Sequence, residues 1–210
     1  MGQIEDYIDV KQTAWLLGAD VRTVQGMLQK KRLKGIHGKK KLLVDLRSVE
    51  VFFVKKVNAY EKAVNYFDTI KNKKEYWSMT EKNINIKSDV DGYLSVPQTA
   101  YLLNSSRQRI LDMIQRNIFL TMTRTVKNTD RVLISEESIE LYVHNSLCAI
   151  YDKYKNLIEY IESKDKDEYW MLHAEDIRIT ITEQENRRRK YFKDNYERKK
   201  RVEWENSKKN

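Results

Sequence analysis

The chain has 210 residues, of which 40% are hydrophobic and 34% are charged, with a formal net charge of +9. This length fits one large domain or two small ones, and the positive charge favours a polyanionic partner such as nucleic acid or an acidic membrane surface. The absence of any apolar run of 18 residues argues against a membrane-spanning helix. One cysteine argues against a disulfide or cysteine–zinc framework, and one proline with six glycines argues against an all-β fold.

The sequence repeats itself. Residues 7–17 resemble residues 93–103 at an offset of 86, and nine of the 28 pairs from 7/93 to 34/120 are identical. The match resumes for residues 42–50 with 132–140 at an offset of 90, and for 75–77 with 168–170, both Glu-Tyr-Trp, at an offset of 93. Three collinear matches with a growing offset predict a tandem duplication with insertions in loops.

Each copy is predicted to begin with a short helix. Asp9 with Gln12, and Ser95 with Gln98, have the spacing of a capping box, in which the first side chain and the third residue after it satisfy each other's backbone N–H groups. Pro97 suits the first turn of the second of these helices, because its missing N–H has no partner there.

A second short helix is predicted after a tight break. Gly18 and Asn104 suit the left-handed residue that ends a helix, and Asp20 and Ser106 can cap the next one. This helix should run to about residue 31 in the first copy and 117 in the second. Two short helices joined in this way form a helix-turn-helix.

A basic stretch and an apolar triplet follow in each copy, at 34–44 and 121–134, and we interpret them as a β-hairpin with a basic tip, longer in the second copy. Asp45 and Ser135 should then cap one long helix of some six turns, with an apolar stripe that ends near Ile70 and Ile161. Such a helix projects beyond a small unit and needs a partner. The two long helices could pair within the chain, or between chains as a homodimer.

Residues 13–24, Leu33, the basic hairpin and Val44-Asp-Leu-x-x-Val49 resemble the MerR/excisionase class of winged helix-turn-helix. The likeness covers about residues 7–60 and 93–150. It departs in the second copy, where Asn104 replaces Gly18 and Arg109 replaces Thr23. It implies that the second helix enters the DNA major groove, that the wing touches the backbone or minor groove, and that the C-terminal helix often mediates dimerisation.

The predicted fold is mainly α with small β-hairpin wings. It has two tandem winged helix-turn-helix units, each followed by a long helix, and a basic C-terminal helix or tail. The expected division is a first unit at 1–80, a linker at 81–92, a second unit at 93–173 and the basic tail at 174–210.

Double-stranded DNA is the expected partner, and the surface residues fall into three groups. The start of the second helix reaches base edges in a helix-turn-helix, since Val24 and Ile110 must face the core; the candidates are Arg22, Thr23, Gln25, Arg107, Gln108 and Arg109. Phosphate contacts are expected further along, from Lys30, Lys31 and Arg116. The wings would add Lys39, Lys40, Lys41, Arg124, Lys127 and Arg131.

A basic arm is expected near the C-terminus. Residues 187–201 hold nine basic and two acidic residues, and Thr182 to Glu185 has capping-box spacing, so a helix should start there. The arm is either a further phosphate-binding element or a solvated tail, and its candidates are Arg187, Arg188, Arg189, Lys190, Arg198, Lys199, Lys200 and Arg201.

Signals for an enzyme are absent. His37, His144 and His173 are scattered, and no metalloprotease, P-loop, dinucleotide-binding or nucleophile-elbow motif occurs. Cys148 lies beside the apolar stripe and is expected to be a small core residue. The repeated Glu-Tyr-Trp is expected to pack against the helices of its own unit. We expect no enzymatic activity, no cofactor, no metal and no small-molecule ligand.

The leading interpretation is a sequence-specific regulator of transcription of phage, plasmid or bacterial genes that reads two unlike half-sites, because the two candidate recognition helices differ. One alternative is an architectural DNA-binding protein, such as an excisionase-like or partition factor. Another is a protein-interaction module that uses the winged fold. Residues 1–6 lack the basic and apolar regions of a signal peptide, so a cytoplasmic, nucleoid-associated protein is expected.

Overall fold

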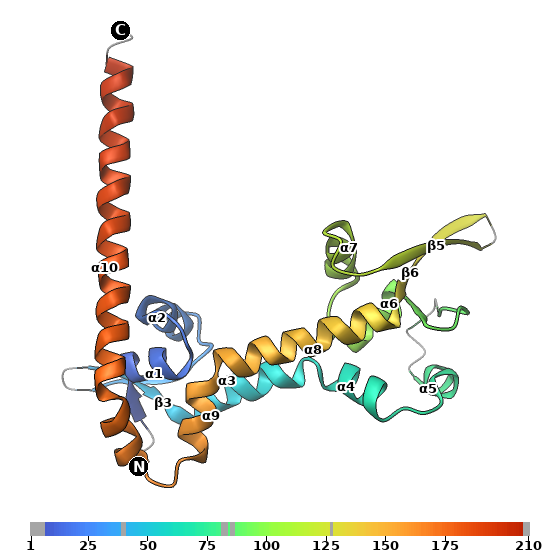
Figure 1. Cartoon of the computed structure of the whole chain (residues 1–210), viewed down its shortest axis with the longest axis horizontal. Helices are drawn as coiled ribbons and strands as arrows, with labels where there is room; N and C mark the ends of the chain where they lie inside the picture. Colours follow the sequence, from blue (N-terminus) through green and yellow to red (C-terminus); the bar gives the residue numbers. More distant parts are fainter. Residues whose placement is uncertain (1–6, 39–40, 81–83, 85–86, 127, 208–210) are drawn as a thin grey trace. The chain divides into compact units, whose positions relative to one another are not determined.

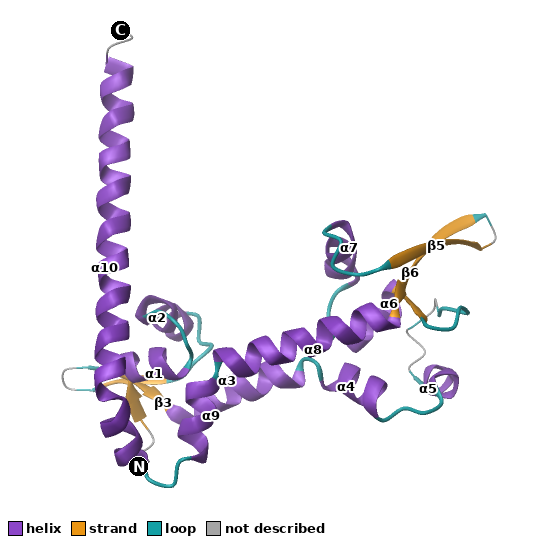
Figure 2. Cartoon of the chain, in the orientation of Figure 1, coloured by secondary structure: helices purple, strands orange, loops and turns teal. Residues whose placement is uncertain are grey.

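The computed structural model describes residues 7–38, 41–80, 84, 87–126 and 128–207, with side chains to residue 203. These residues are mainly helical, with two small antiparallel three-stranded sheets (Figures 1 and 2). This confirms a mainly α chain that carries small β-hairpins.

The first sheet and the helices beside it come from residues 7–45. Strand β1 (Tyr7–Asp9) leads into helices α1 (Val10–Leu16) and α2 (Val21–Gln29), and strands β2 (Gly35–His37) and β3 (Leu42–Asp45) follow as a hairpin. The sheet order is β1-β3-β2, so β3 lies in the middle, with Ile8 opposite Val44. The predicted capping box is present, since Asp9 accepts the backbone N–H of Gln12 at 2.7 Å and the Gln12 side chain accepts that of Asp9 at 2.9 Å.

Residues 93–135 repeat this arrangement. Strand β4 (Tyr93–Ser95), helices α6 (Val96–Leu102) and α7 (Arg107–Gln115) and strands β5 (Thr121–Val126) and β6 (Thr129–Ser135) occur in the same order. The sheet order is β4-β6-β5, and Leu94 lies opposite Ile134. The hairpin is longer than the first, as predicted. We call residues 7–45 and 93–135 the two heads.

The turns between the short helices also agree. Gly18 and Asn104 have φ values of +50° and +45°, and Lys31 and Asn117, just after the second helices, have +55° and +54°. The equivalent positions of the two heads therefore adopt the same left-handed conformation, and Asn and Gly are the residues that tolerate it most easily.

The predicted long helices are each broken, so the expectation of one continuous helix was wrong. Residues 46–70 form α3 (Leu46–Asn58) and α4 (Glu61–Asp68), and residues 136–162 form α8 (Glu136–Lys153) and α9 (Lys155–Glu162). The breaks lie at Tyr60 and Tyr154, which are the N-cap residues of α4 and α9. The apolar stripe continues across each break, which is why the spacing alone did not reveal it.

Two further helices follow these pairs. Helix α5 (Lys73–Met79) follows α4, and helix α10 (Lys166–Ser207) follows α9 and has 42 residues. The prediction that a tail helix starts at Thr182 was wrong. Thr182 lies inside α10, where its hydroxyl donates to the carbonyl of Arg178 at 2.8 Å.

The chain forms two compact units: unit 1 is Met1–Phe52 with Lys153–Asn210, and unit 2 is Phe53–Asp152. This division differs from the consecutive blocks expected from the repeat. Unit 1 joins the first head to α9 and α10, which follow the second head in sequence. Unit 2 joins the second head to α4 and α5, which follow the first. The two repeats have therefore exchanged their trailing helices.

Equivalent contacts hold the exchanged helices in both units. In unit 2, α4 packs against α6, and the ammonium of Lys62 lies 4.0 Å from the ring centroid of Tyr101. In unit 1, α9 packs against α1, and the amide of Asn156 donates to the carbonyl of Trp15 at 3.2 Å. Lys62 and Asn156 are each the second residue of their helix, and Trp15 and Tyr101 are counterparts in the repeat.

The repeated aromatic pair closes each unit, and it contacts helices of both repeats rather than its own alone. Trp77 packs against Tyr66 of α4, with ring centroids 5.3 Å apart, and against Tyr101 of α6. Tyr169 packs against Tyr160 of α9 at 5.3 Å, and its hydroxyl lies 3.4 Å from the indole nitrogen of Trp15. The core of unit 2 also includes Leu94, Leu102, Ile110, Ile134 and Ile139.

Candidate nucleic-acid interface

The first turns of α2 and α7 present the predicted recognition residues. Val24 and Ile110 are fully buried and fix the inward face of each helix. The opposite face is exposed and carries all six candidates, Arg22, Thr23, Gln25, Arg107, Gln108 and Arg109. Each head thus brings its predicted set together on one helix turn, where donors and acceptors could reach base edges.

The N-termini of these helices are capped differently. The hydroxyl of Ser106 accepts the backbone N–H of Arg109 at 3.2 Å, which holds the first turn of α7. Asp20 has the extended backbone of an N-cap but makes no side-chain cap hydrogen bond. Its carboxylate still adds negative charge at the positive end of α2.

The two candidate recognition helices also differ in their neighbours. Gln108 donates to the carboxylate of Asp112 on its own helix at 2.9 Å. Arg22, its counterpart in the repeat, instead lies 5.9 Å from the ring centroid of Phe192 on α10. The same position therefore faces a neighbouring helix in unit 1 and its own helix in unit 2.

The residues predicted to contact phosphates lie where each second helix ends. Lys30 and Arg116 are the C-cap residues of α2 and α7, and Lys31 follows Lys30; all three are exposed. They lie one to two turns beyond the candidate recognition residues, between the second helix and the hairpin of each head.

In the described part of the hairpins, one of the predicted cations, Arg124, is already paired. In the first, Lys41 is exposed, while Lys39 and Lys40 lie outside the described residues. In the second, Arg124 lies directly opposite Arg131, and its guanidinium pairs with Asp89 at 2.8 Å; Lys127 is outside the described residues. Like charges facing each other across a ladder are unfavourable, and an anion or Asp89 relieves that repulsion.

The basic segment belongs to a continuous helix rather than a loose tail. The eight predicted residues, Arg187, Arg188, Arg189, Lys190, Arg198, Lys199, Lys200 and Arg201, are all exposed on α10. Within unit 1, the buried Ile181 and a hydrogen bond of 3.3 Å from Gln184 to the carbonyl of Ala19 fix α10 beside α1 and α2. The basic segment continues α10 beyond these contacts (Figure 1).

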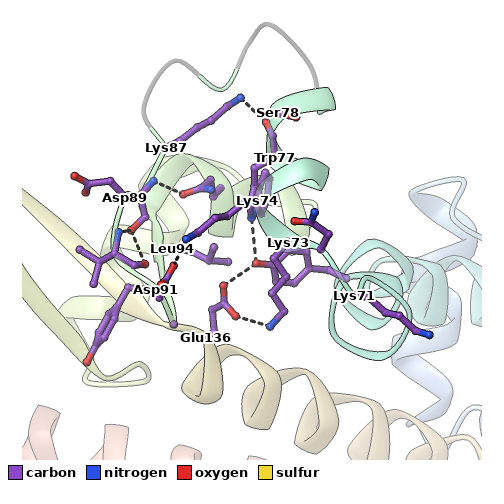
Figure 3. Close-up of a pocket in the computed structure, with 17 residues that line it drawn as sticks. Lys71, Lys73, Lys74, Trp77, Ser78, Lys87, Asp89, Asp91, Leu94 and Glu136 are labelled. Atoms are coloured by element: carbon purple, nitrogen blue, oxygen red, sulfur yellow. Dashed lines mark hydrogen bonds and ion pairs between the residues drawn. The ribbon is translucent and has the colours of Figure 1, made fainter.

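Sequence reasoning missed a lysine-rich cavity of about 1120 Å³ in unit 2 (Figure 3). Its cations are Lys71, Lys73, Lys74 and Lys87, and the close run of three lysines from 71 to 74 was the available signal. Lys73 pairs with Glu136 at 2.5 Å, Lys74 with Asp91 at 3.1 Å, and Lys87 donates to the carbonyl of Trp77.

Glu136 also anchors a short buried chain of hydrogen bonds. The Tyr66 hydroxyl donates to Glu136 at 2.7 Å and accepts from the indole N–H of Trp77 at 3.1 Å. Burial, followed by the hydrogen bond to Glu136, raises the pKa of Tyr66 above its ordinary value. Most of the charged side chains of the cavity already have partners within unit 2. We therefore assign the cavity a structural role, in which its contacts hold α4 and α5 against α8.

The histidines and the cysteine do not form a metal-binding group. Cys148 is exposed, so its prediction as a core residue was wrong; it lies 3.6 Å from His144 one helical turn earlier. His173 packs against Trp15 and Tyr169, with ring centroids at 5.8 and 4.4 Å. Among the described residues, no three His, Cys, Asp or Glu side chains gather as a metal site, and no helix could cross a membrane.

Comparisons with known proteins were made on family models, curated proteins and solved structures, and none of the three finds a match to this chain.

Proposed function

We propose that the chain binds double-stranded DNA through two winged helix-turn-helix heads, with α2 and α7 as recognition helices, and that it regulates transcription of phage, plasmid or bacterial genes. The observation that carries the proposal is the repeated presentation of Arg22, Arg107 and Arg109, with their neighbours, on the exposed first turn of a helix whose other face is buried. This is the turn that reaches base edges in helix-turn-helix proteins. The sequence resemblance to the MerR/excisionase class supports the same interpretation.

The two heads should read unlike sequences. The equivalent first turns are Val21-Arg22-Thr23 and Arg107-Gln108-Arg109. Arg pairs well with guanine and Gln with adenine, so different side chains at matched positions select different bases. A site recognised by one chain would therefore consist of two unlike half-sites.

Selection of bound DNA from a random pool at physiological salt tests this proposal. We expect one enriched site with two unlike halves, and Arg107→Ala with Arg109→Ala should relax the preference in one half only. Lys71→Ala is the matched control, since Lys71 is an exposed lysine of unit 2 in the loop between α4 and α5.

Two outcomes would contradict the proposal. Binding that spreads along any DNA without enrichment would favour the architectural alternative. A chain that shifts no DNA at low salt would favour protein interaction instead.

A further inference from the structure

Helix α10 changes the surroundings of one recognition helix. A cavity of about 550 Å³ lies between the first turn of α2 and α10, lined by Arg22, Thr23 and Gln25 on one side and by Gln184, Arg187 and Arg188 among others on the other. Both helices belong to unit 1, and α10 passes α2 and continues beyond it (Figure 1). The recognition surface of the first head is therefore shared by two helices.

Three arginine side chains line this cavity. Arg22 and Arg188 both lie over the ring of Phe192, at 5.9 and 5.6 Å from its centroid, and Arg187 lines the same cavity. Among the ion pairs of the described residues, Arg187 has a loose contact of 3.8 Å to Glu183, and none is found for Arg22 or Arg188. Asp20 and Glu185 also line the cavity, so the net charge of its lining is +1. Arginines that line one cavity suit a phosphate, because each guanidinium can donate two parallel hydrogen bonds to it.

The geometry of DNA limits what α2 can read in this setting. The major groove is about 12 Å wide and admits one helix, whose own diameter with side chains is about 10–12 Å. Helix α10, which packs against the first turn of α2, therefore cannot enter the same groove together with α2. It would lie over the phosphates beside the groove, where its nine basic residues between 187 and 201 would neutralise backbone charge.

The second head offers the contrast. Arg107 and Arg109 are exposed on the first turn of α7, and in the described part of unit 2 the trailing helix α5 ends at Met79 without a counterpart to the basic segment of α10. Among the described residues neither side chain makes an ion pair, and the charge of Arg109 acts on the hydroxyl of Tyr142.

We propose that the two heads divide the work. Unit 1 anchors the DNA backbone through a phosphate site formed by Arg22, Arg187 and Arg188, whereas the arginines that read bases, Arg107 and Arg109, lie in unit 2. This assignment rests on the proposed DNA binding and moves Arg22 from base reading to phosphate binding, which leaves Thr23 and Gln25 as the base-facing residues of α2.

The test measures two quantities for the full chain and its variants: the ratio of affinities for the selected site and a scrambled duplex, and the slope of log K against log salt. For Arg22→Ala, and for Arg187→Ala with Arg188→Ala, we expect weaker binding to both duplexes, an unchanged ratio, and a slope reduced by about 0.9 for each phosphate that the variant no longer neutralises. For Arg109→Ala we expect the ratio to fall by a factor of about 5 to 150, the range for removal of a bidentate pairing with a base. Lys164→Ala and Lys71→Ala, exposed lysines at equivalent loop positions of the two repeats, should change neither quantity.

The results separate the possible failures. If Arg22→Ala lowers the affinity ratio as Arg109→Ala does, Arg22 reads bases and the phosphate site is refuted. If the variants of Arg22, Arg187 and Arg188 leave both the affinity and the slope unchanged, while the wild-type chain still selects its site, α10 does not contact DNA and the division of work is refuted. A wild-type chain that binds no duplex at about 50 mM salt overturns the proposed function itself.

Discussion

Helices α2 and α7 occupy equivalent positions in the two repeats, but their surroundings differ. Both bury one apolar residue completely, Val24 or Ile110, and both expose their first turn. Helix α2 shares that turn with α10 through Phe192 and the arginines around it, whereas Gln108 on α7 bonds within its own helix. Duplication has therefore kept the scaffold, while a neighbouring helix has given one of the two surfaces a different chemistry.

The largest expected effect concerns the two repeated tryptophans. Trp77 is buried in unit 2 and donates to Tyr66, while Trp170 is only partly buried in unit 1. Trp77→Ala should lower the free energy of unfolding by about 3–5 kcal/mol, the range for large core truncations. Trp170→Ala should cost about 1–2 kcal/mol. Urea unfolding followed by circular dichroism measures both, and equal losses would show that the two units are packed equally tightly.

Gly18 and Asn104 occupy equivalent turns, but replacing each by the other residue should change the stability of the chain by different amounts. A Cβ atom on Gly18 would lie 2.7 Å from the carbonyl oxygen of Lys153, in addition to the left-handed φ of +50°. Gly18→Asn should therefore destabilise the chain by about 2 kcal/mol. The converse change, Asn104→Gly, should stay within about 0.5 kcal/mol. Thermal unfolding of the two variants decides this, and a neutral Gly18→Asn would mean that the backbone at Lys153 can move away.

Alkaline pH should lower the free energy of unfolding, mainly through the buried tyrosines. Burial raises the pKa of Tyr66 in unit 2 and of Tyr160 in unit 1. Their hydroxyls ionise later in the folded chain than in the unfolded chain, so their contribution is complete below about pH 10 and is lost as the pH rises above it. The slope should approach about 1.4 kcal/mol per pH unit for each such group. The slope of unfolding free energy against pH should be smaller in Tyr66→Phe than in the wild-type chain, and urea unfolding between neutral and alkaline pH measures it. An identical slope would show that Tyr66 does not contribute to the pH dependence.

The smallest effect on stability is expected from shortening α10. A chain that ends at Asn186 keeps Ile181 and Gln184, which hold α10 to the first head. Of the described side chains that it loses, all but the partly buried Asn195 are exposed, and the contact of Phe192 with Arg22 is lost with them. Its free energy of unfolding should stay within about 0.5 kcal/mol of the full chain. Its DNA affinity should fall and its salt dependence should become flatter. An unchanged salt dependence would show that the basic segment does not contribute to binding.

Much of each head was predictable from sequence, because its determinants are local. The capping boxes at Asp9 and Ser95 and the left-handed positions at Gly18 and Asn104 place the short helices within a few residues of their observed ends. The candidate residues on α2 and α7 followed from the burial expected for Val24 and Ile110. These features depend on spacing within one short segment.

The breaks at Tyr60 and Tyr154, the exchange of trailing helices and the cluster around Phe192 were not predictable. A tyrosine continues an apolar stripe whether or not the helix does. The sequence does not show which head Tyr76 and Trp77 pack against, because the two heads have similar aromatic residues, Trp15 and Tyr101, at the contact. Phe192 and Arg22 are 170 positions apart, and no local pattern in the sequence relates them.

The exchange of trailing helices has a consequence for the order in which the chain can fold as it is synthesised. Unit 2 is continuous and is complete once residue 152 has left the ribosome. Unit 1 is interrupted by unit 2 and must wait for Tyr169 and Ile181, which are buried and belong to its second segment. Domains usually mature from the N-terminus onward during translation. Here the inner unit is finished first, and the first head emerges early but obtains its covering helices last.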